Sequence, residues 1–372
     1  MMKESILELA GWSAAAFLLS FAGVLGLTRW ARRHGVLDVP NERSAHAHPV
    51  PRGGGLPIVL VTFSFLWLYC ALHPEDIRWR AILTFSAGGI LIAFVSWLDD
   101  IRSLPNSIRI SVHSVAALLA IWGTGYWFTS HIPELEQAQY GWIGLPMTFL
   151  WIIGLTNAYN FMDGVDGLAG TMAVAGGAGW FIADRVDGLH FVAALGLLVA
   201  ASSLGFLCLN WPPARVFMGD VGSAFLGYTF SVVPLWYGTF RKDGSAGTVA
   251  LLALILMWPF VFDSAFTILR RLVKGENIFK SHQSHLYQRL WRAGYSHRFI
   301  TVLYGALAAS GLLLSVPVAC GLTWGAPVAI AVVVLLAAAL WGTVGVLERR
   351  RARLASPPPG RILSAPQKPL KD

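Results

Sequence analysis

The sequence predicts an all-α integral membrane protein with about eleven transmembrane helices. Of its 372 residues, 55% are hydrophobic and 13% are charged, and this charged fraction is about half that of a soluble domain. Apolar runs of about 20 residues recur along the whole chain, and each is long enough to cross a bilayer as a helix. Polar and basic residues gather in the stretches between these runs.

Each apolar run is assigned to one membrane span. The predicted spans cover residues 9–28, 54–73, 80–98, 109–129, 141–157, 167–183, 189–209, 221–239, 247–269, 299–320 and 324–347. Residues 1–347 then form a single polytopic membrane domain. Residues 348–372 are basic and Pro-rich, a composition typical of a disordered tail.

Positive charges predict the orientation of these spans. Of the 28 lysines and arginines, 22 fall in one set of loops and 6 in the other. Cytoplasmic loops carry an excess of Lys and Arg. The crowded set, which includes the loop 270–298 and the tail, is therefore predicted to face the cytoplasm. This places the N-terminus outside and the C-terminus inside.

The net charge of +8 does not indicate a partner nucleic acid. The basic residues lie between apolar runs, and no stripe of alternating aromatic and basic residues is present. Cys70, Cys208 and Cys320 are scattered in apolar stretches without paired spacing. They are predicted to be small packing residues and not a disulfide framework or a metal cluster.

Five polar segments lie at the predicted inner ends of the spans. They read VPNERSAHAHPVPRGGG (39–55), SWLDDIRSLP (96–105), NAYNFMDGVDG (157–167), NWPPARVFMGDVGSAFLGY (210–228) and KSHQSHLYQRL (280–290). An aspartate at the bilayer centre costs about 3 kcal/mol, so carboxylates are expected near span ends. However, these segments all share one face under a topology derived from positive charges alone. This coincidence indicates a common site.

The residue types in these segments suit a metal-bound diphosphate. Mg²⁺ is usually held by one or two carboxylates, completed by water and phosphate, and phosphates are held by Arg and His. Glycines beside the aspartates, such as Gly164, allow backbone N–H groups to approach an anion. The sequence therefore predicts a site for a metal-bound pyrophosphate at the cytoplasmic membrane surface.

Each cluster also has a simpler interpretation. Asp99 and Asp100 are compatible with a solvated helix end. Asp163 and Asp166 are compatible with a capped helix start, and Asp220 with an N-cap. The histidines of the first inner loop, taken singly, are compatible with ordinary loop residues.

Asp263 is the acidic residue that is predicted to lie inside a span, near its inner end, in PFVFDSAFTILRR. It either approaches the same site or pairs with Arg270 or Arg271, and a structural role is favoured.

Three of these motifs resemble a known family. NAYNFMDGVDGLAG (157–170), SWLDD (96–100) and VFMGDVGSAFLG (216–227) are similar to the signatures of the polyprenyl-phosphate N-acetylhexosamine-1-phosphate transferases. This bacterial glycosyltransferase family includes enzymes that initiate O-antigen synthesis. PNERSAHAHPVPRGGG (40–55) resembles the family's first inner loop, and the resemblance continues in order to about residue 294.

The resemblance implies a reaction and its partners. A sugar-1-phosphate moves from a UDP-N-acetyl sugar to undecaprenyl phosphate, UMP leaves, and Mg²⁺ or Mn²⁺ is required. Residues 1–347 are then the catalytic domain, in the bacterial inner membrane with its active-site loops in the cytoplasm. The step begins O-antigen or other cell-surface polysaccharide synthesis. Relatives suggest a homodimer, although the sequence shows no interface.

The motifs also carry site residues over to this chain. Asp220 and Asp163 are implied as metal ligands. Asp99, Asp100 and Asp163 are implied as catalytic residues. The implied substrate-binding residues are Asn160, Gly164, Asp166, Asn210, Phe217, Arg43, His46, Arg52, His282 and His285.

One position departs from the family pattern. Many relatives carry His-x-His-His in the last large loop, whereas this chain reads HLYQ at 285–288. The phosphate contact of the missing histidines is therefore open, and Gln288, Arg289 or His282 is available to replace it. The form SHLYQRL resembles the O-antigen subgroup, whose donors include UDP-linked N-acetyl deoxyhexosamines as well as UDP-N-acetylglucosamine.

Alternatives of mechanism and of class stay open. Direct attack by a lipid phosphate that Asp99 orients, and a two-step route through a phosphorylated aspartate such as Asp163, both fit the motifs. The main alternative class is a polytopic transporter, but transporters bind near the bilayer midplane, whereas these carboxylates lie at the inner ends of spans. An inert scaffold is less consistent with the intact aspartates. The sequence does not specify the donor sugar.

Overall fold

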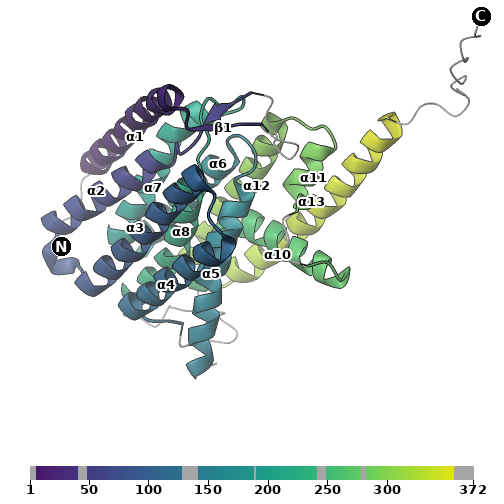
Figure 1. The fold of residues 1–372 in the computed structure, drawn as a ribbon. Coiled ribbons are helices and arrows are strands. Elements are labelled where there is room, and N and C mark those ends of the chain that lie inside the picture. The colour runs from purple at the N-terminus through teal and green to yellow at the C-terminus, as the bar shows by residue number, and fades with distance from the viewer. Residues whose placement is uncertain are drawn as a thin grey trace, which may run out of the picture.

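The protein is a bundle of helices in the computed structural model, which describes residues 6–40, 48–127, 141–187, 190–240, 249–277 and 282–355 (Figure 1). The helices of these residues are α1 (Ile6–His34), α2 (Leu56–Leu72), α3 (Trp79–Arg102), α4 (Asn106–Thr124), α5 (Gly144–Met162), α6 (Leu168–Asp187), α7 (His190–Asn210), α8 (Asp220–Phe240), α9 (Val249–Leu256), α10 (Trp258–Val273), α11 (Leu286–Arg292), α12 (His297–Ala319) and α13 (Gly325–Ala355). Two short strands, β1 (Leu37–Asp38) and β2 (Val50–Pro51), pair antiparallel at one end of the bundle.

A helix covers each of the eleven predicted apolar segments, and α9 and α10 share one of them. Among the described residues, six helices are long and apolar enough to cross a bilayer, namely α1, α3, α4, α7, α12 and α13. The number is seven if α9 and α10 form one span, and α2 is a shorter apolar helix. The protein is therefore an all-helical, multi-pass membrane protein. The number of eleven spans and the N-out orientation stay predictions.

The helix α8 lies at the centre of the bundle (Figure 1). Every residue from 221 to 237 is buried, and α3 and α5 pack closely against it. A helix that is buried all round contacts protein on every face. Its first residue, Asp220, consequently emerges at the middle of one end of the bundle, beside the ends of the neighbouring helices.

The predicted span 247–269 is broken in the structure. α9 ends at Leu256, α10 begins at Trp258, and their axes differ by 81°. Pro259 lies in the first turn of α10, where its missing N–H is tolerated and its fixed φ suits a helix start. The short helix α11, which the sequence did not predict, lies within the inner loop 270–298.

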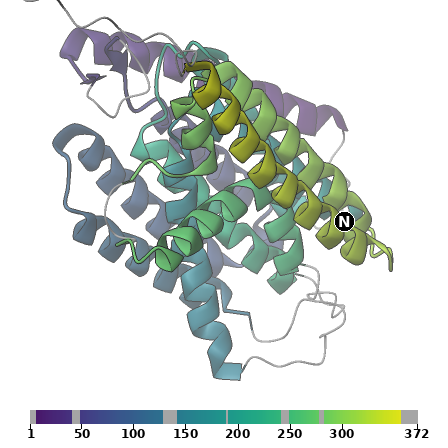
Figure 2. The same cartoon turned by 90° about the vertical axis from the view of Figure 1, so that its right-hand side faces the viewer.

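The C-terminal helix is longer than predicted. α13 runs beside α12 along one flank (Figure 2) and continues to Ala355, so residues 348–355 are helical and not part of a disordered tail. The extension is held by α11, because Nε of Arg289 donates to Glu348 at 2.8 Å. Residues 356–372 lie outside the described part of the chain.

Candidate active site

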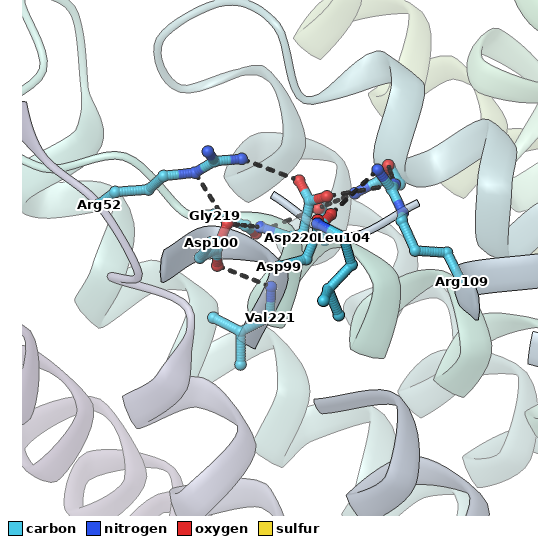
Figure 3. A network of polar contacts seen from close by, with 10 residues as sticks. Arg52, Asp99, Asp100, Leu104, Arg109, Gly219, Asp220 and Val221 are labelled. Atoms are coloured by element: carbon cyan, nitrogen blue, oxygen red, sulfur yellow. Dashed lines mark hydrogen bonds and ion pairs between the residues drawn. The ribbon is translucent and has the colours of Figure 1, made fainter. Parts of the chain in front are cut away.

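Asp220 is held between two arginines at the start of α8 (Figure 3). Its Oδ1 lies 3.2 Å from Nη2 of Arg52, and its Oδ2 lies 3.1 Å from Nη2 of Arg109. Arg52 follows β2, and Arg109 lies in the first turn of α4. The Asp220 side chain is 17% exposed. The two guanidinium groups offset the cost of removing this carboxylate from water.

Asp100, near the end of α3, positions Asp220 through the backbone. One carboxylate oxygen of Asp100 accepts a hydrogen bond from the Asp220 N–H at 2.9 Å, and the other accepts from the Val221 N–H at 3.2 Å (Figure 3). Nε of Arg52 lies 2.8 Å from the first of these oxygens. Asp100 therefore caps α8, where a negative charge also interacts favourably with the helix dipole.

Asp99 contacts a different set of groups. It accepts a hydrogen bond from the Leu104 N–H and lies 3.2 Å from Nη1 of Arg109. Arg109 also donates to Oδ1 of Asn160 at 2.7 Å. The same guanidinium thus joins Asp99, Asn160 and Asp220. Arg109 was not predicted as a site residue, because at the start of a predicted span it counts among the orientation charges.

Backbone pairing explains why Arg52 reaches Asp220 from 168 positions away in the sequence. The Phe217 N–H donates to the Pro51 carbonyl at 2.8 Å, and the Gly54 N–H donates to the Phe217 carbonyl at 2.8 Å. The segment after β2 is thereby fixed against the loop before α8. The two motifs PRGGG and VFMGD form one wall.

Asp163 and Asp166 lie in the loop that joins α5 to α6. Oδ2 of Asp166 accepts from the Ala214 N–H at 3.0 Å, and its Oδ1 lies 3.1 Å from Nδ1 of His297. This carboxylate therefore ties the α5–α6 loop to the loop before α8 and to the start of α12. His297 was not predicted as a site residue.

The two predicted asparagines have structural partners. Asn210, which is 3% exposed, accepts from the Gly167 N–H at 2.8 Å and donates to the Val216 carbonyl at 2.9 Å. Asn160 donates to Oγ of Ser223 at 2.9 Å. Asn210 thus joins two loops of the site, whereas Asn160 joins α5 to α8.

These loops surround a cavity of about 380 Å³. The predicted residues that line it are Arg52, Asp163, Gly164, Asp166, Asn210, Phe217 and Asp220. Lining residues that the sequence did not assign to the site include Asp38, Tyr287, Trp291 and His297. Described residues that were predicted but do not line it are Asp99, Asp100, Asn160, His282 and His285. The predicted Arg43 and His46 lie outside the described residues.

The last inner loop presents one of the suggested replacements, Gln288, together with a residue that was not predicted. Tyr287 and Gln288 line the cavity, whereas His285 is 4% exposed, with its Nδ1 3.2 Å from Asp263. Burial, followed by the nearby His285, lowers the pKa of His282 to about 4. His282 is then uncharged near neutral pH, which makes it a poor replacement for a phosphate-binding cation.

Asp220 and Asp163 are in contrasting electrostatic surroundings. Burial raises the pKa of Asp220, but Arg109 and Arg52 lower it more, so it falls below the usual range. Burial, followed by repulsion from Asp220, raises the pKa of Asp163 to about 8. A divalent cation near both carboxylates would remove that repulsion.

Two aspartates of the cavity are candidate ligands for a divalent metal. No group of three or more His, Cys, Asp or Glu residues in the described part of the chain is arranged to hold a metal ion. Asp163 and Asp220 nevertheless line one cavity. Mg²⁺ usually binds one or two carboxylates and completes its shell with water and substrate phosphate. The residues therefore fit a Mg²⁺ ion that is held jointly with a phosphate ligand, and not a closed protein cage.

Comparison with known proteins identifies the family to which this multi-pass membrane protein belongs. Residues 82–238, which run from α3 to α8, match glycosyl transferase family 4. A Bacillus subtilis (strain 168) protein named "Probable undecaprenyl-phosphate N-acetylglucosaminyl 1-phosphate transferase" is 36% identical over 78% of this chain and 80% of its own. The decaprenyl-phosphate N-acetylglucosaminephosphotransferase of Mycobacterium leprae (strain TN) is 28% identical over 80% of each chain.

A further relative is the undecaprenyl-phosphate alpha-N-acetylglucosaminyl 1-phosphate transferase of Escherichia coli (strain K12). It is 28% identical over 76% of this chain and 77% of its own. The chain therefore belongs to the polyprenyl-phosphate N-acetylhexosamine-1-phosphate transferase family, as its motifs predicted. The matched region contains Asp99, Asp100, Asp163, Asp166 and Asp220.

Proposed function

We propose that this protein transfers an N-acetylhexosamine phosphate or N-acetyl-deoxyhexosamine phosphate from a UDP-sugar to undecaprenyl phosphate and releases UMP. The observation that carries the proposal is the cavity of about 380 Å³ whose wall combines Asp163, Asp220 and Arg52. The names of the relatives support a polyprenyl phosphate acceptor and N-acetylglucosamine phosphate as the transferred group. UDP-N-acetylglucosamine is therefore the first donor to test.

The charges of the reactants explain the residue types in the cavity. A lipid phosphate and a nucleotide diphosphate are both anionic, so they repel each other on approach. Arg52 and Arg109 supply positive charge at the site. Mg²⁺ or Mn²⁺, bound by Asp220 and Asp163, would add positive charge that stabilises the leaving UMP.

The proposed step is a direct displacement at phosphorus. An oxygen of the lipid phosphate attacks the sugar-linked phosphorus of the donor. The bond from that phosphorus to the bridging oxygen breaks, and UMP leaves with the electron pair. Asp99 keeps the attacking phosphate deprotonated or orients it, while Asp166, Asn210 and Phe217 bind the nucleotide.

A two-step route is distinguished by isotope exchange. If an aspartate such as Asp163 were phosphorylated first, labelled UMP would exchange into the UDP-sugar without lipid acceptor. Direct displacement predicts exchange only when undecaprenyl phosphate is present.

The proposed activity is tested with purified protein, undecaprenyl phosphate, Mg²⁺ and a panel of UDP-N-acetyl sugars. We expect UMP release with at least one donor, loss of release after chelation with EDTA, and recovery with Mg²⁺ or Mn²⁺. No UMP with any donor would refute the proposal. Ion-dependent solute uptake into vesicles by such an inactive protein would support a transporter instead.

We place the site at the cytoplasmic face of the bacterial inner membrane, where it would begin the synthesis of a cell-surface polysaccharide such as O-antigen. The relatives supporting this placement are bacterial proteins that use polyprenyl phosphates by name. A homodimer stays a prediction, and the mass of the protein in detergent, corrected for bound detergent, tests it.

A further inference from the structure

Asp263 is a fully buried carboxylate on α10, with 0% exposure. A buried charge is costly unless it is paired and hydrogen-bonded. Here both oxygens are engaged. Oδ2 accepts from the Tyr304 hydroxyl of α12 at 2.6 Å, and Oδ1 accepts from the Thr267 hydroxyl of α10 at 3.3 Å. The neighbouring arginines bond elsewhere: Arg270 donates to the Ser284 carbonyl and Arg271 to the Asn277 carbonyl.

The same carboxylate fixes the start of α11. Oδ1 of Asp263 accepts from the Leu286 N–H at 2.8 Å, and Oδ2 accepts from the Tyr287 N–H at 3.2 Å. These amides are in the first turn of a helix and so lack intrahelical partners. A negative charge at this end also stabilises the helix dipole. Asp263 therefore anchors α11 to the membrane helices α10 and α12.

The anchored residue Tyr287 reaches the wall of the cavity. Its hydroxyl donates to the Phe161 carbonyl at 2.8 Å, two residues before Asp163. A side-chain carbon at Gly164 would collide with this hydroxyl, so the ring lies directly against the α5–α6 loop. A contact path thus runs from Asp263 through Tyr287 to the loop that carries Asp163 and Gly164.

We infer that Asp263 is a positioning residue for the donor site: it sets the depth of Tyr287 against the α5–α6 loop. It touches no substrate, and it acts by holding the first turn of α11. Gln288, which also lines the cavity, is held by the same turn, because the His285 N–H donates to its Oε1 at 3.2 Å. The inference rests on the proposed transferase activity.

The binding of undecaprenyl phosphate should not depend on the contacts that run from Asp263 through Tyr287. Asp99, which we assign to the lipid phosphate, contacts Arg109 and the Leu104 N–H, and neither of these partners lies on α11 or in the α5–α6 loop. A displaced α11 should therefore raise the KM for the UDP-sugar and leave the KM for undecaprenyl phosphate unchanged. General loss of folded protein would instead lower kcat alone and leave both KM values unchanged.

The test compares steady-state kinetics of purified Asp263→Asn with those of wild-type protein. Asparagine has nearly the shape of aspartate but carries no charge. Its side-chain NH₂ group would also face the N–H and O–H groups that donate to Asp263. We expect the donor KM to rise about tenfold, the effect of misplacing one or two hydrogen-bonding groups, with the acceptor KM within about twofold. Thr267→Val is the matched control, because it removes a single 3.3 Å donor from α10 itself, and its donor KM should stay within about twofold.

Tyr304→Phe keeps the inference testable if Asp263→Asn does not fold. This change removes the shortest bond to Oδ2, the oxygen shared with the Tyr287 N–H, so a smaller rise in donor KM is expected. The inference is overturned if wild-type protein is active but the donor KM is unchanged in the folded variants. It is also overturned if both KM values rise equally. Inactive wild-type protein would refute the proposed function itself.

Discussion

Arg109 joins three residues of the site, since Asp99, Asn160 and Asp220 all contact its guanidinium. Arg109→Gln removes the positive charge that two carboxylates share, so we expect kcat to fall about 100-fold, as when one charge-stabilising donor is lost from an active site. UMP release at saturating donor and acceptor measures the effect.

The matched control is Arg102→Gln. It removes the same charge from the same inner loop, but Arg102 is exposed at the end of α3. Exposed charges contribute little, so kcat should stay within about twofold. Equal losses in the two variants would show that the overall charge of the loop, and not the contacts of Arg109, supports turnover.

The aspartates were predictable and Arg109 was not, for a physical reason. Carboxylates are costly to place in a membrane-spanning chain. Each of the three groups containing Asp99, Asp163 and Asp220 therefore indicates a functional site. Arginine at a span end has an alternative explanation as an orientation charge. Only the contacts of the folded chain separate Arg109 from Arg102.

At the scale of elements, the position of Asp220 depends on a close contact. The segment that precedes α2 packs directly against the start of α8. A side-chain carbon at Gly55 would overlap the backbone of Gly222, and the Gly55 N–H donates to the Met218 carbonyl at 2.8 Å. Gly55→Ala must push these segments apart. We expect activity to fall at least about tenfold and the thermal midpoint in detergent to decrease, because overpacking a tight contact is destabilising.

Gly154→Ala on α5 is the control for this substitution. No atom lies within 4 Å of the position that its Cβ would take, and alanine is favoured over glycine in a helix. Its activity and thermal midpoint should equal or exceed those of the wild type. A tolerated Gly55→Ala would mean that the two segments can separate without moving Asp220.

Helix positions followed from composition, whereas α11 and the break between α9 and α10 did not. A run of apolar residues indicates a span whether it is straight or bent, so the bend of 81° was invisible in 247–269. α11 has seven residues, too few for a helical period to be recognised. Its position depends on Asp263, which contacts it from another helix.

At the scale of the whole molecule, α3 provides a test of orientation. Arg78 and Arg102 lie at its two ends, about 36 Å apart at a rise of 1.5 Å per residue. In a cysteine-free variant, Arg78→Cys should react with a membrane-impermeant maleimide in intact cells. Arg102→Cys should react only after lysis, because the N-out topology places it in the cytoplasm.

The reverse labelling pattern would place the cavity outside the cell, where UDP-sugars are absent, and would contradict both the orientation and the proposed donor. Labelling of both positions in intact cells would indicate leaky cells and is checked with a cytoplasmic control protein. Cys208 and Cys320 are exposed and are therefore replaced before either cysteine is introduced.

The sequence by itself determined the helical membrane class and the family, and it singled out the aspartates as candidate site residues, because hydropathy and rare polar residues are local properties of the chain. Tertiary structure decided which of these residues share a wall. Asp100 caps α8, and backbone pairing brings Arg52 to Asp220. At the cavity the lining residue is Tyr287 and not the predicted His285. These outcomes depend on contacts between distant segments, which no local pattern records.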